Sequence, residues 1–453
     1  MAALAGLLKG AGHKVSGSDT NIYPPMSVLL ENAGIPVLPG YRKENIKGDI
    51  DLVIVGNTVS KTNEEVQAVL EAGLDYTSFP GALSRFFLEG RKSLVVAGTH
   101  GKTTTTSLVA SILTEGGLDP TFVIGGLLTS AGTNAGLGTS EYLVAEADES
   151  DGSFQLLQPV MAVVTNIDED HMETFDNDLD QLKQSFSTFI HRVPFYGVTV
   201  LCVDDDHVYE LAQNTSRHQI TYGLTERAQV QAINLKQIKQ HMWFDVLIDG
   251  EMALKQVKLN LPGTHNVLNA LAAIAIGLEL DVKMAAMHKA LAEFNGVGRR
   301  FNIYADTRIN DKSFTLIDDY AHHPTELAAA IKACQEGWPE QRLVLVFQPH
   351  RYSRTRDLFD DFADVLNGVD KLLITEVYPA GESVISGATA NDLCRSIRNR
   401  GKLDPVFVHD IQAVPAAIAH VVEDDDVVLM LGAGNIGALI QDMLAELSAG
   451  GDQ

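Results

Sequence analysis

The sequence predicts an α/β fold built on mostly parallel sheets, and two features of the chain lead to this. Short apolar runs alternate with segments of helical period, which is the pattern of parallel strands covered by helices. Most of these runs break into polar or glycine-rich residues, and ligands of open α/β sheets bind at such carboxyl ends. The clearest runs are residues 51–57, 93–101, 141–149, 160–168, 342–350 and 426–434.

The length of 453 residues exceeds what one hydrophobic core usually supports and indicates two to four domains. Boundaries near Leu88 and Arg299 predict three. Residues 1–88 are predicted to form a Rossmann-like domain that begins with a helix in "MAALAGLL". Residues 89–298 follow as a P-loop ATPase-like domain, a mostly parallel sheet with an antiparallel insertion at 204–258. Residues 299–453 are expected to form a second Rossmann-like domain.

The composition excludes several classes of function. Hydrophobic residues make up 45% of the chain, but no apolar stretch approaches the roughly 18 residues that span a bilayer, so no membrane role and no export are expected. A formal net charge of −25 without a basic patch argues against a nucleic-acid partner. Three scattered cysteines (Cys202, Cys334 and Cys394) are typical of reduced thiols rather than of a zinc site, so a cytoplasmic protein is expected.

The segment "GTHGKTTTT" follows an apolar strand and precedes a helix with an apolar face, which indicates a phosphate-binding loop. Its backbone N–H groups would surround an anion, Lys102 would neutralise phosphate charge, and the hydroxyl of Thr103 would ligate Mg²⁺. Only two residues separate the glycines, so the loop is a shortened variant, and an ordinary glycine turn is the alternative. The residues predicted to bind nucleotide here are Gly98, Thr99, His100, Gly101, Lys102, Thr103 and Thr104.

Two further residues follow neighbouring strand ends and could complete a metal site. Glu146 lies in "VAEADESD", and His171 follows "VVTNIDEDH". Taken alone, an acidic run is usually a solvated face and a single histidine is usually structural. Both residues could nevertheless reach the γ-phosphate side of a nucleotide held by Lys102, so Glu146, His171 and Thr103 are the predicted metal ligands.

Seven motifs, in order along the chain, resemble those of the Mur ligase family. They are "GTHGKTTTT", "EADESD", "TNIDEDHM", "LPGTHNVLNA", "GVGRRF", "DDYAHHPTE" and "FQPHRYSRTRDL". The resemblance implies an ATP-dependent enzyme of peptidoglycan precursor synthesis that forms an amide bond through an acyl phosphate. The motifs near the C-terminus, with "EVYPAGE", look like the branch that joins L-alanine to UDP-N-acetylmuramate, so these two molecules, ATP and Mg²⁺ are the expected ligands.

The same resemblance implies roles for individual residues. It places Asn166 beside the acceptor substrate, Asn269 at the adenine edge with His265 and Asn266 around it, Arg300 at the phosphates and Asp319 at the ribose. The catalytic set implied is Lys102, Asn166, His171 and Arg351, with Thr103 on one Mg²⁺ ion and Glu146 and His171 on a second. The substrate-binding set is Ser18, Asp19, Asn134, Tyr320, His322, Arg351 and Arg354.

The segment "QPHRYSRTRD" suits the carboxylate of an amino acid, because the planar fork of arginine matches a carboxylate. Arg351 and Arg354 are three residues apart, so one helical turn would place them on the same face. An exposed basic turn is the alternative. The adjacent His322 and His323 could suggest zinc, but no cysteine or further histidine lies at ligand spacing.

A competing motif, "GAGNIG" at residues 432–437, follows a strand and opens a helix, as the dinucleotide fingerprint of an NAD-dependent oxidoreductase does. The acidic residue expected about twenty positions later would fall beyond Gln453, and no strand can follow. The motif is therefore interpreted as the closing strand turn of the third domain, where glycines permit close packing.

The first domain leaves two questions open. Members of the family begin this Rossmann-like domain with a strand and a glycine-rich loop that binds the UDP diphosphate, and the resemblance implies that this first strand and loop are missing here. The affinity for UDP-sugar should therefore be reduced, and a nucleotide-binding protein without catalysis remains an alternative. Residues 21–35, "NIYPPMSVLLENAGI", look more like a recycling branch that attaches L-alanyl-γ-D-glutamyl-meso-diaminopimelate. L-Alanine is favoured, because the resemblance implies that the third domain selects the acceptor, and "HRYSRTRD" and "VYPAGE" lie in that domain. A monomer or weak homodimer is expected.

Overall fold

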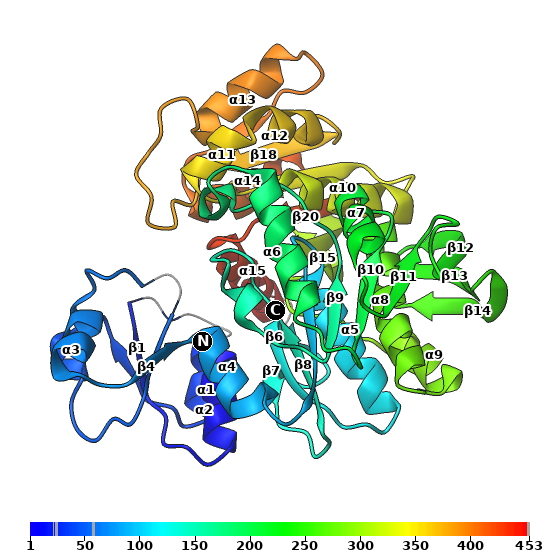
Figure 1. Ribbon diagram of the computed structural model, residues 1–453. Coiled ribbons are helices and arrows are strands. Elements are labelled where there is room, and N and C mark those ends of the chain that lie inside the picture. The colour runs from blue at the N-terminus through cyan, green and yellow to red at the C-terminus, as the bar shows by residue number, and fades with distance from the viewer. Residues whose placement is uncertain (21, 23–25, 57–58, 451–453) are drawn as a thin grey trace. The chain divides into compact units, whose positions relative to one another are not determined.

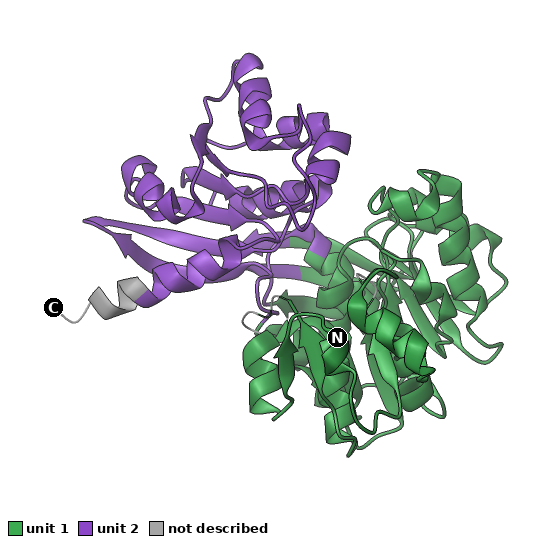
Figure 2. Ribbon diagram, turned by 90° about the vertical axis from the view of Figure 1, so that its left-hand side faces the viewer, with its two compact units in different colours: residues 1–235, 244–259, 266–295 green, residues 236–243, 260–265, 296–453 purple. Residues whose placement is uncertain are grey.

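The computed structural model describes residues 1–450 except 21, 23–25 and 57–58. The chain divides into two compact units, coloured separately in Figure 2. Unit 1 contains residues 1–235, 244–259 and 266–295, and unit 2 contains residues 236–243, 260–265 and 296–453. The division into three domains at residues 88 and 298 stays a prediction.

The start of unit 1 is helical, as the sequence predicts. Helix α1 (Ala2–Gly10) buries Leu4, Leu7 and Leu8, whose spacing of three to four residues puts them on one face. Strand β1 (Gly17–Asp19) then pairs in parallel with β2 (Val37–Pro39). The motif at residues 21–35, which resembles the recycling branch, lies partly outside the described residues.

Two more strands and three helices complete this segment. Strands β3 (Val53–Val55) and β4 (Tyr76–Ser78) form a second parallel pair. The helices are α2 (Met26–Asn32), α3 (Glu64–Ala72) and α4 (Phe79–Leu83). Helix α3 has sharp ends because the Asn63 side chain accepts hydrogen bonds from two backbone N–H groups and Gly73 ends the helix in the left-handed conformation.

A ten-stranded sheet follows, in the order β14-β13-β12-β11-β10-β9-β5-β8-β6-β7 (Figure 1). Its first strands are β5 (Lys92–Ala97), β6 (Thr121–Leu128), β7 (Thr133–Gly136), β8 (Tyr142–Glu146), β9 (Met161–Val164) and β10 (Val198–Cys202). The later strands are β11 (Gln219–Gly223), β12 (Val230–Ile238), β13 (His241–Ile248) and β14 (Glu251–Leu259). Strand β5 pairs in parallel with β8 and β9, so the polar residues that follow these three strands lie at one edge of the sheet.

The helices of this region are α5 (Lys102–Glu115), α6 (Leu179–His191), α7 (Asp206–Asn214), α8 (Thr264–Glu279) and α9 (Met284–Ala292). Helix α5 is buried along most of its length, including the predicted apolar positions Leu108, Val109, Ile112 and Leu113. Its threonines are compatible with a helix here because hydroxyls bond back to the preceding turn, Thr106 Oγ1 donating to the Lys102 carbonyl at 2.8 Å.

The predicted antiparallel insertion at residues 204–258 is wrong in its first part. Helix α7 carries the chain back to the starting end of the sheet, so β11 pairs in parallel with β10, and β12 pairs in parallel with β11. Strands β6 and β7 are antiparallel, which the sequence did not predict.

Unit 2 contains a six-stranded sheet in the order β15-β16-β20-β17-β18-β19. Strand β15 (Asn302–Ile309) is antiparallel to β16 (Lys312–Asp319), and the other pairs are parallel. The remaining strands are β17 (Leu343–Phe347), β18 (Lys371–Thr375), β19 (Val406–Val408) and β20 (Val427–Leu431). The helices are α10 (Pro324–Gly337), α11 (Tyr352–Asp357), α12 (Phe359–Leu366), α13 (Ala390–Asn399), α14 (Val414–Val421) and α15 (Ile436–Gly450). Two apolar clusters cover the sheet, as expected for parallel strands buried on both faces.

The "GAGNIG" segment connects β20 to α15, and its glycines are needed for packing. A Cβ atom on Gly434 would lie 2.4 Å from Gln348 Oε1, and one on Gly437 would lie 2.3 Å from Arg299. Gln348 Oε1 also accepts a hydrogen bond from the Ile436 backbone at 3.1 Å. This close packing supports the interpretation of the motif as a strand turn.

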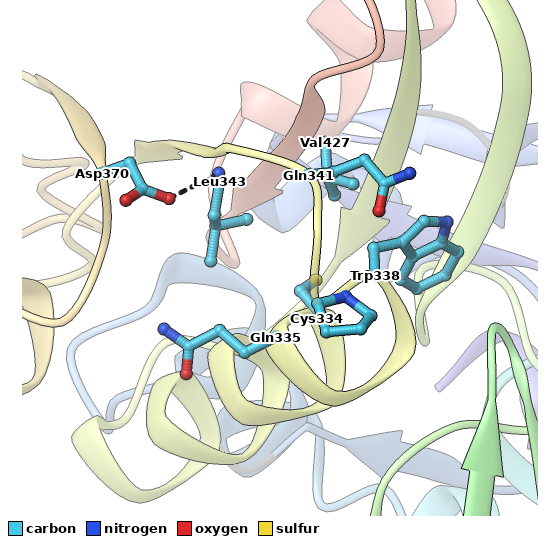
Figure 3. Close-up of a pocket in the computed structure, with 8 residues that line it drawn as sticks. Cys334, Gln335, Trp338, Gln341, Leu343, Asp370 and Val427 are labelled. Atoms are coloured by element: carbon cyan, nitrogen blue, oxygen red, sulfur yellow. Dashed lines mark hydrogen bonds between the residues drawn. The ribbon is translucent and has the colours of Figure 1, made fainter.

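A shallow pocket in unit 2 lies at the amino ends of β17 and β20, where Leu343 N donates to Asp370 Oδ2 at 2.8 Å (Figure 3). Its lining residues are Cys334, Gln335, Trp338, Pro339, Gln341, Leu343, Asp370 and Val427. Ligands of parallel sheets bind at the carboxyl ends, so this pocket is on the opposite edge from the predicted site residues. Within the described residues, no helix is both long and apolar enough to span a bilayer. Cys202, Cys334 and Cys394 are buried and form no disulfide.

Candidate active site

The loop between β5 and α5 has the backbone of an anion-binding site. Gly98 and Gly101 have φ values of 136° and 81°, which side chains rarely adopt, and Gly101 is the residue that immediately precedes the helix. The first N–H groups of α5 have no partner within the helix and carry the positive end of its dipole. The loop is thus suited to bind phosphate, as the sequence predicts.

Lys102 begins the helix and its ammonium group turns back over the loop. Its Nζ atom donates to the carbonyl oxygens of Gly98 (2.7 Å) and Thr99 (2.9 Å). It also pairs with both carboxylate oxygens of Glu149, at 3.0 and 2.7 Å. Burial raises the pKa of Glu149 to about 7, while Lys102 opposes this rise. The sequence did not single out Glu149, although it lies in the quoted "EADESD" segment.

Thr103 and Glu146, two of the three predicted metal ligands, lie together. The Thr103 hydroxyl donates to Glu146 Oε1 at 3.1 Å, and the backbone N–H of Gly125 donates to Glu146 Oε2 at 2.8 Å. His171 follows β9, and its Nε2 atom is 3.7 Å from a carboxylate oxygen of Asp170. The hydroxyl and carboxylate oxygens form a donor set that suits Mg²⁺, which prefers oxygen ligands.

Asn166, predicted to help position the acceptor, holds the loop itself. Its Oδ1 atom accepts from the His100 backbone N–H at 2.8 Å, and its Nδ2 atom donates to the His100 carbonyl at 3.0 Å. The His100 carbonyl also accepts from Thr165 Oγ1 at 2.6 Å, and the His100 ring lies 2.9 Å from Asp168. Residues that follow β9 therefore fix the middle of the phosphate loop.

Asn269, predicted at the adenine edge, also lies at this loop. It is buried in α8, and its Oδ1 atom accepts from Thr105 Oγ1 at 3.1 Å. Its Nδ2 atom donates to Asn266 Oδ1 at 3.1 Å. A Cβ on Gly101 would lie 2.5 Å from Asn269 Oδ1, which explains why position 101 is glycine. The adenine contact stays a prediction.

The predicted nucleotide residues of unit 2 cluster around the end of β16. Asp319 accepts hydrogen bonds from the backbone N–H groups of Phe301 (2.7 Å) and Ala321 (2.8 Å), and burial raises its pKa to about 6. The Arg300 guanidinium lies 5.2 Å from the centroid of the Tyr320 ring. His265 is in this unit too, and burial lowers its pKa to about 4, so its imidazole is neutral at pH 7.

The structure brings the "QPHRYSR" and "VYPAGE" motifs together at the ends of β17 and β18. Arg351 N donates to the Tyr378 carbonyl at 2.9 Å, and Tyr378 N donates to the Pro349 carbonyl at 2.8 Å. Both the N–H and the hydroxyl of Ser353 donate to the carboxylate of Glu382, at 2.9 and 2.6 Å. The two motifs thus form one rigid surface.

Histidine and tyrosine rings extend this surface. The His350 ring stacks on Tyr378 with centroids 5.4 Å apart, and the His322 ring lies 5.7 Å from that of His350. Tyr320 follows at 5.2 Å from His322. The predicted substrate residues Tyr320 and His322 therefore lie in the same row of rings as the residue preceding Arg351.

The expectation that Arg351 and Arg354 share one helical turn is wrong. Arg351 precedes α11 with a φ of 70° and a ψ of 134°, outside the helical region, whereas Arg354 is a buried residue within the helix. The hydrogen bond from Arg351 N to the Tyr378 carbonyl holds this backbone, so the loop and not a helix directs the Arg351 side chain.

The substrate residues predicted in unit 1 have partners within the protein. Ser18 Oγ donates to Glu65 Oε2 at 2.5 Å, and the Asp19 carbonyl accepts from Gly40 N at 2.7 Å. Asn134 is buried in β7, with Nδ2 at 3.4 Å from Met26 Sδ. Their contacts with a UDP-sugar stay predictions.

Gly98→Ala is expected to lower the free energy of unfolding by about 2–4 kcal/mol, because a Cβ there would combine strain with overpacking. That Cβ would lie 2.0 Å from Thr165 Oγ1 at a φ of 136°. Gly117→Ala is the matched control, since its φ of 80° is also left-handed but nothing lies within 4 Å. Equal shifts of the urea midpoint in both variants would contradict a specific requirement for glycine in the loop.

Three domains of one known protein family match successive segments of the chain. Residues 1–91 match the catalytic domain of the Mur ligase family, residues 96–277 match the Mur ligase middle domain, and residues 299–434 match the Mur ligase glutamate ligase domain. Together these segments cover most of the chain.

Individual proteins agree with this. The chain is 51% identical over 445 residues to UDP-N-acetylmuramate--L-alanine ligase of Janthinobacterium sp. (strain Marseille), covering 97% of this chain and 95% of that protein. It resembles the crystal structure of UDP-N-acetylmuramate-alanine ligase MurC from Thermotoga maritima with a TM-score of 0.84 and 28% identity, over 99% of this chain and 97% of that one. The murein peptide ligase mpl from Psychrobacter arcticus 273-4 gives a TM-score of 0.72 and 27% identity, over 99% and 96%. The chain therefore belongs to the Mur ligase family.

Proposed function

We propose that this protein is an ATP-dependent ligase that joins the carboxylate of UDP-N-acetylmuramate to the amine of L-alanine. The observation that carries the proposal is the phosphate loop at the start of α5, where Lys102 and Thr103 lie beside the carboxylates of Glu149 and Glu146. The 51% identity to a UDP-N-acetylmuramate--L-alanine ligase supports this choice of substrates.

The chemistry accounts for the residue types at the loop. Attack of a carboxylate on the γ-phosphate gives an acyl phosphate and ADP, and attack of the amine then releases phosphate. Both steps gather negative charge in one place, so the protein must supply cations and N–H donors. Lys102 and the first N–H groups of α5 provide these, and the network around Asn166 keeps the loop in position.

A magnesium ion suits the neighbouring oxygens. Thr103 and Glu146 would hold it, with His171 as the third predicted ligand, and the ion would supply further positive charge beside the phosphates.

The amino acid is assigned to unit 2. Its carboxylate would bind Arg351, which the backbone of Tyr378 holds at the head of α11, with the rings of His322 and Tyr320 near the amine. Arg354 is the second predicted arginine, and its burial in α11 suits a supporting position.

The test is an acceptor panel that measures phosphate release and the ligated product. We expect turnover only when ATP, Mg²⁺, UDP-N-acetylmuramate and L-alanine are present together, and little with glycine, L-serine or L-alanyl-γ-D-glutamyl-meso-diaminopimelate. Preference for the tripeptide would assign the recycling branch, while rapid ATP hydrolysis without an acceptor would contradict a ligase. ATP binding without any turnover would indicate a nucleotide-binding protein that does not catalyse.

A further inference from the structure

Glu149 is a buried carboxylate that the proposed mechanism leaves without a role. Glu149 is 2% exposed and lies three residues after the end of β8. The residue before it, Asp148, is exposed. Both of its oxygens face Lys102 Nζ, the atom expected to hold nucleotide phosphate. Burying a charge pair of this kind requires close geometry, because each ion loses its hydration.

The hydrogen bonds of Lys102 explain why this pair matters. An ammonium group has three N–H donors and no more. In this structure they are directed to the Gly98 carbonyl, the Thr99 carbonyl and the Glu149 carboxylate. A phosphate oxygen can therefore accept from Lys102 only if one of these three acceptors gives up its bond.

Charge decides which of the three is exchanged. The two carbonyls belong to the loop backbone, which Asn166 fixes in its middle and which continues directly into α5. In its ionised form Glu149 carries a negative charge, and a polyphosphate beside it would be repelled at short distance in a poorly solvated site. Its pKa, raised by burial to about 7, agrees with a carboxylate that is costly to keep charged once Lys102 turns to another anion.

We propose that Glu149 is a positioning residue that acts as an internal counterion for Lys102. The pair holds the nucleotide-free loop in an ordered form, and the phosphates of the incoming nucleotide displace the Glu149 carboxylate from Lys102. The inference rests on the proposed function, since nucleotide phosphate is the competing anion. It follows that the strength of this pair sets part of the affinity for nucleotide.

The test measures ADP binding by calorimetry in EDTA, so that no metal contributes. Glu149→Gln keeps the size of the side chain and an acceptor for Lys102 but removes the charge, and we expect the Kd for ADP to fall about tenfold or more. Glu149→Asp, which keeps the charge, should stay within about threefold of the original Kd. Loss of a merely structural contact would instead weaken binding. Glu149→Ala gives the same expected direction should the glutamine variant not fold.

Asp148→Asn is the matched control, because it removes one negative charge from the adjacent, exposed position. We expect a smaller change in its Kd than in that of Glu149→Gln, since the Asp148 charge also acts on Lys102 but is exposed and screened by solvent. An unchanged or weaker affinity of a folded Glu149→Gln protein, or an equal gain in Asp148→Asn, would overturn the inference while leaving the ligase assignment intact. Failure of the unmodified protein to bind ADP both in EDTA and with Mg²⁺ present would overturn both.

Discussion

Lys102→Ala is expected to reduce the rate of ligation by about a thousandfold or more, because it removes the side-chain cation whose ammonium group lies on the phosphate loop. Phosphate release in the presence of both substrates is the measurement. The reduction should appear in kcat as well as in kcat/KM, since the charge that Lys102 neutralises grows as the phosphoryl group is transferred.

The same substitution would leave the Glu149 carboxylate buried without its partner, which could cost about 3–5 kcal/mol of stability. Loss of activity through unfolding must therefore be separated from loss of chemistry. The double variant Lys102→Ala, Glu149→Gln removes both charges, so its melting temperature should recover most of the loss while its activity should not. Turnover above a tenth of the original rate in this folded double variant would remove Lys102 from the catalytic assignment.

Much of this site could be predicted from sequence because parallel strands place their carboxyl ends together. Strands β5, β8 and β9 are neighbours, so a loop after β5 and polar residues after β8 had to meet. Thr103 and Glu146, separated by 43 positions, are in hydrogen-bond contact for this reason. The α/β class follows from the apolar runs, five of which form the largely buried strands β5, β8, β9, β17 and β20 of the two large sheets, while residues 51–57 form the half-buried β3 of a two-stranded sheet.

Glu149 could not be identified in advance, because the sequence of an acidic run does not show which of its side chains is buried. In "EADESD" the side chain of Asp148 is exposed and that of Glu149 is buried, and the turn after β8 decides which one faces Lys102. Its raised pKa is a property of burial, which no spacing in the sequence reveals.

The structure differs from the sequence-based expectation at two further places, and in both the difference depends on the path of the chain after a strand. The short alternating segments at residues 204–258 favoured a hairpin, but α7 is long enough to bring β11 back in parallel. At Arg351 the sequence allowed a helical turn, but the backbone pairs with Tyr378 and delays the start of α11 by one residue. Local pattern cannot decide either case, because the deciding partner is distant in sequence.

Arg351→Ala is expected to raise the KM for L-alanine about a hundredfold while changing kcat much less. The guanidinium is assigned to the amino-acid carboxylate, and a charge-assisted contact of this kind contributes about 1.5–3 kcal/mol of binding. Initial rates at varied L-alanine, with ATP and UDP-N-acetylmuramate held saturating, give the two constants separately. An effect that raised the KM for ATP instead would assign Arg351 to the nucleotide.

Because the backbone of Arg351 has a φ of 70°, substitution could also act through strain. Arg351→Gly tests this, since glycine adopts such a φ freely and lacks the guanidinium. If the side chain binds the carboxylate, the alanine and glycine variants should show the same rise in KM, and Arg351→Lys should recover only part of it because an ammonium cannot form the paired contact. Arg356→Ala is the matched control, because Arg356 is an exposed arginine of the same helix that pairs with Asp357. If the KM for L-alanine stayed near the original value in Arg351→Gly, the loop backbone and not the guanidinium would determine the affinity for the amino acid. If the KM rose equally in Arg356→Ala, the general charge of α11 would determine it.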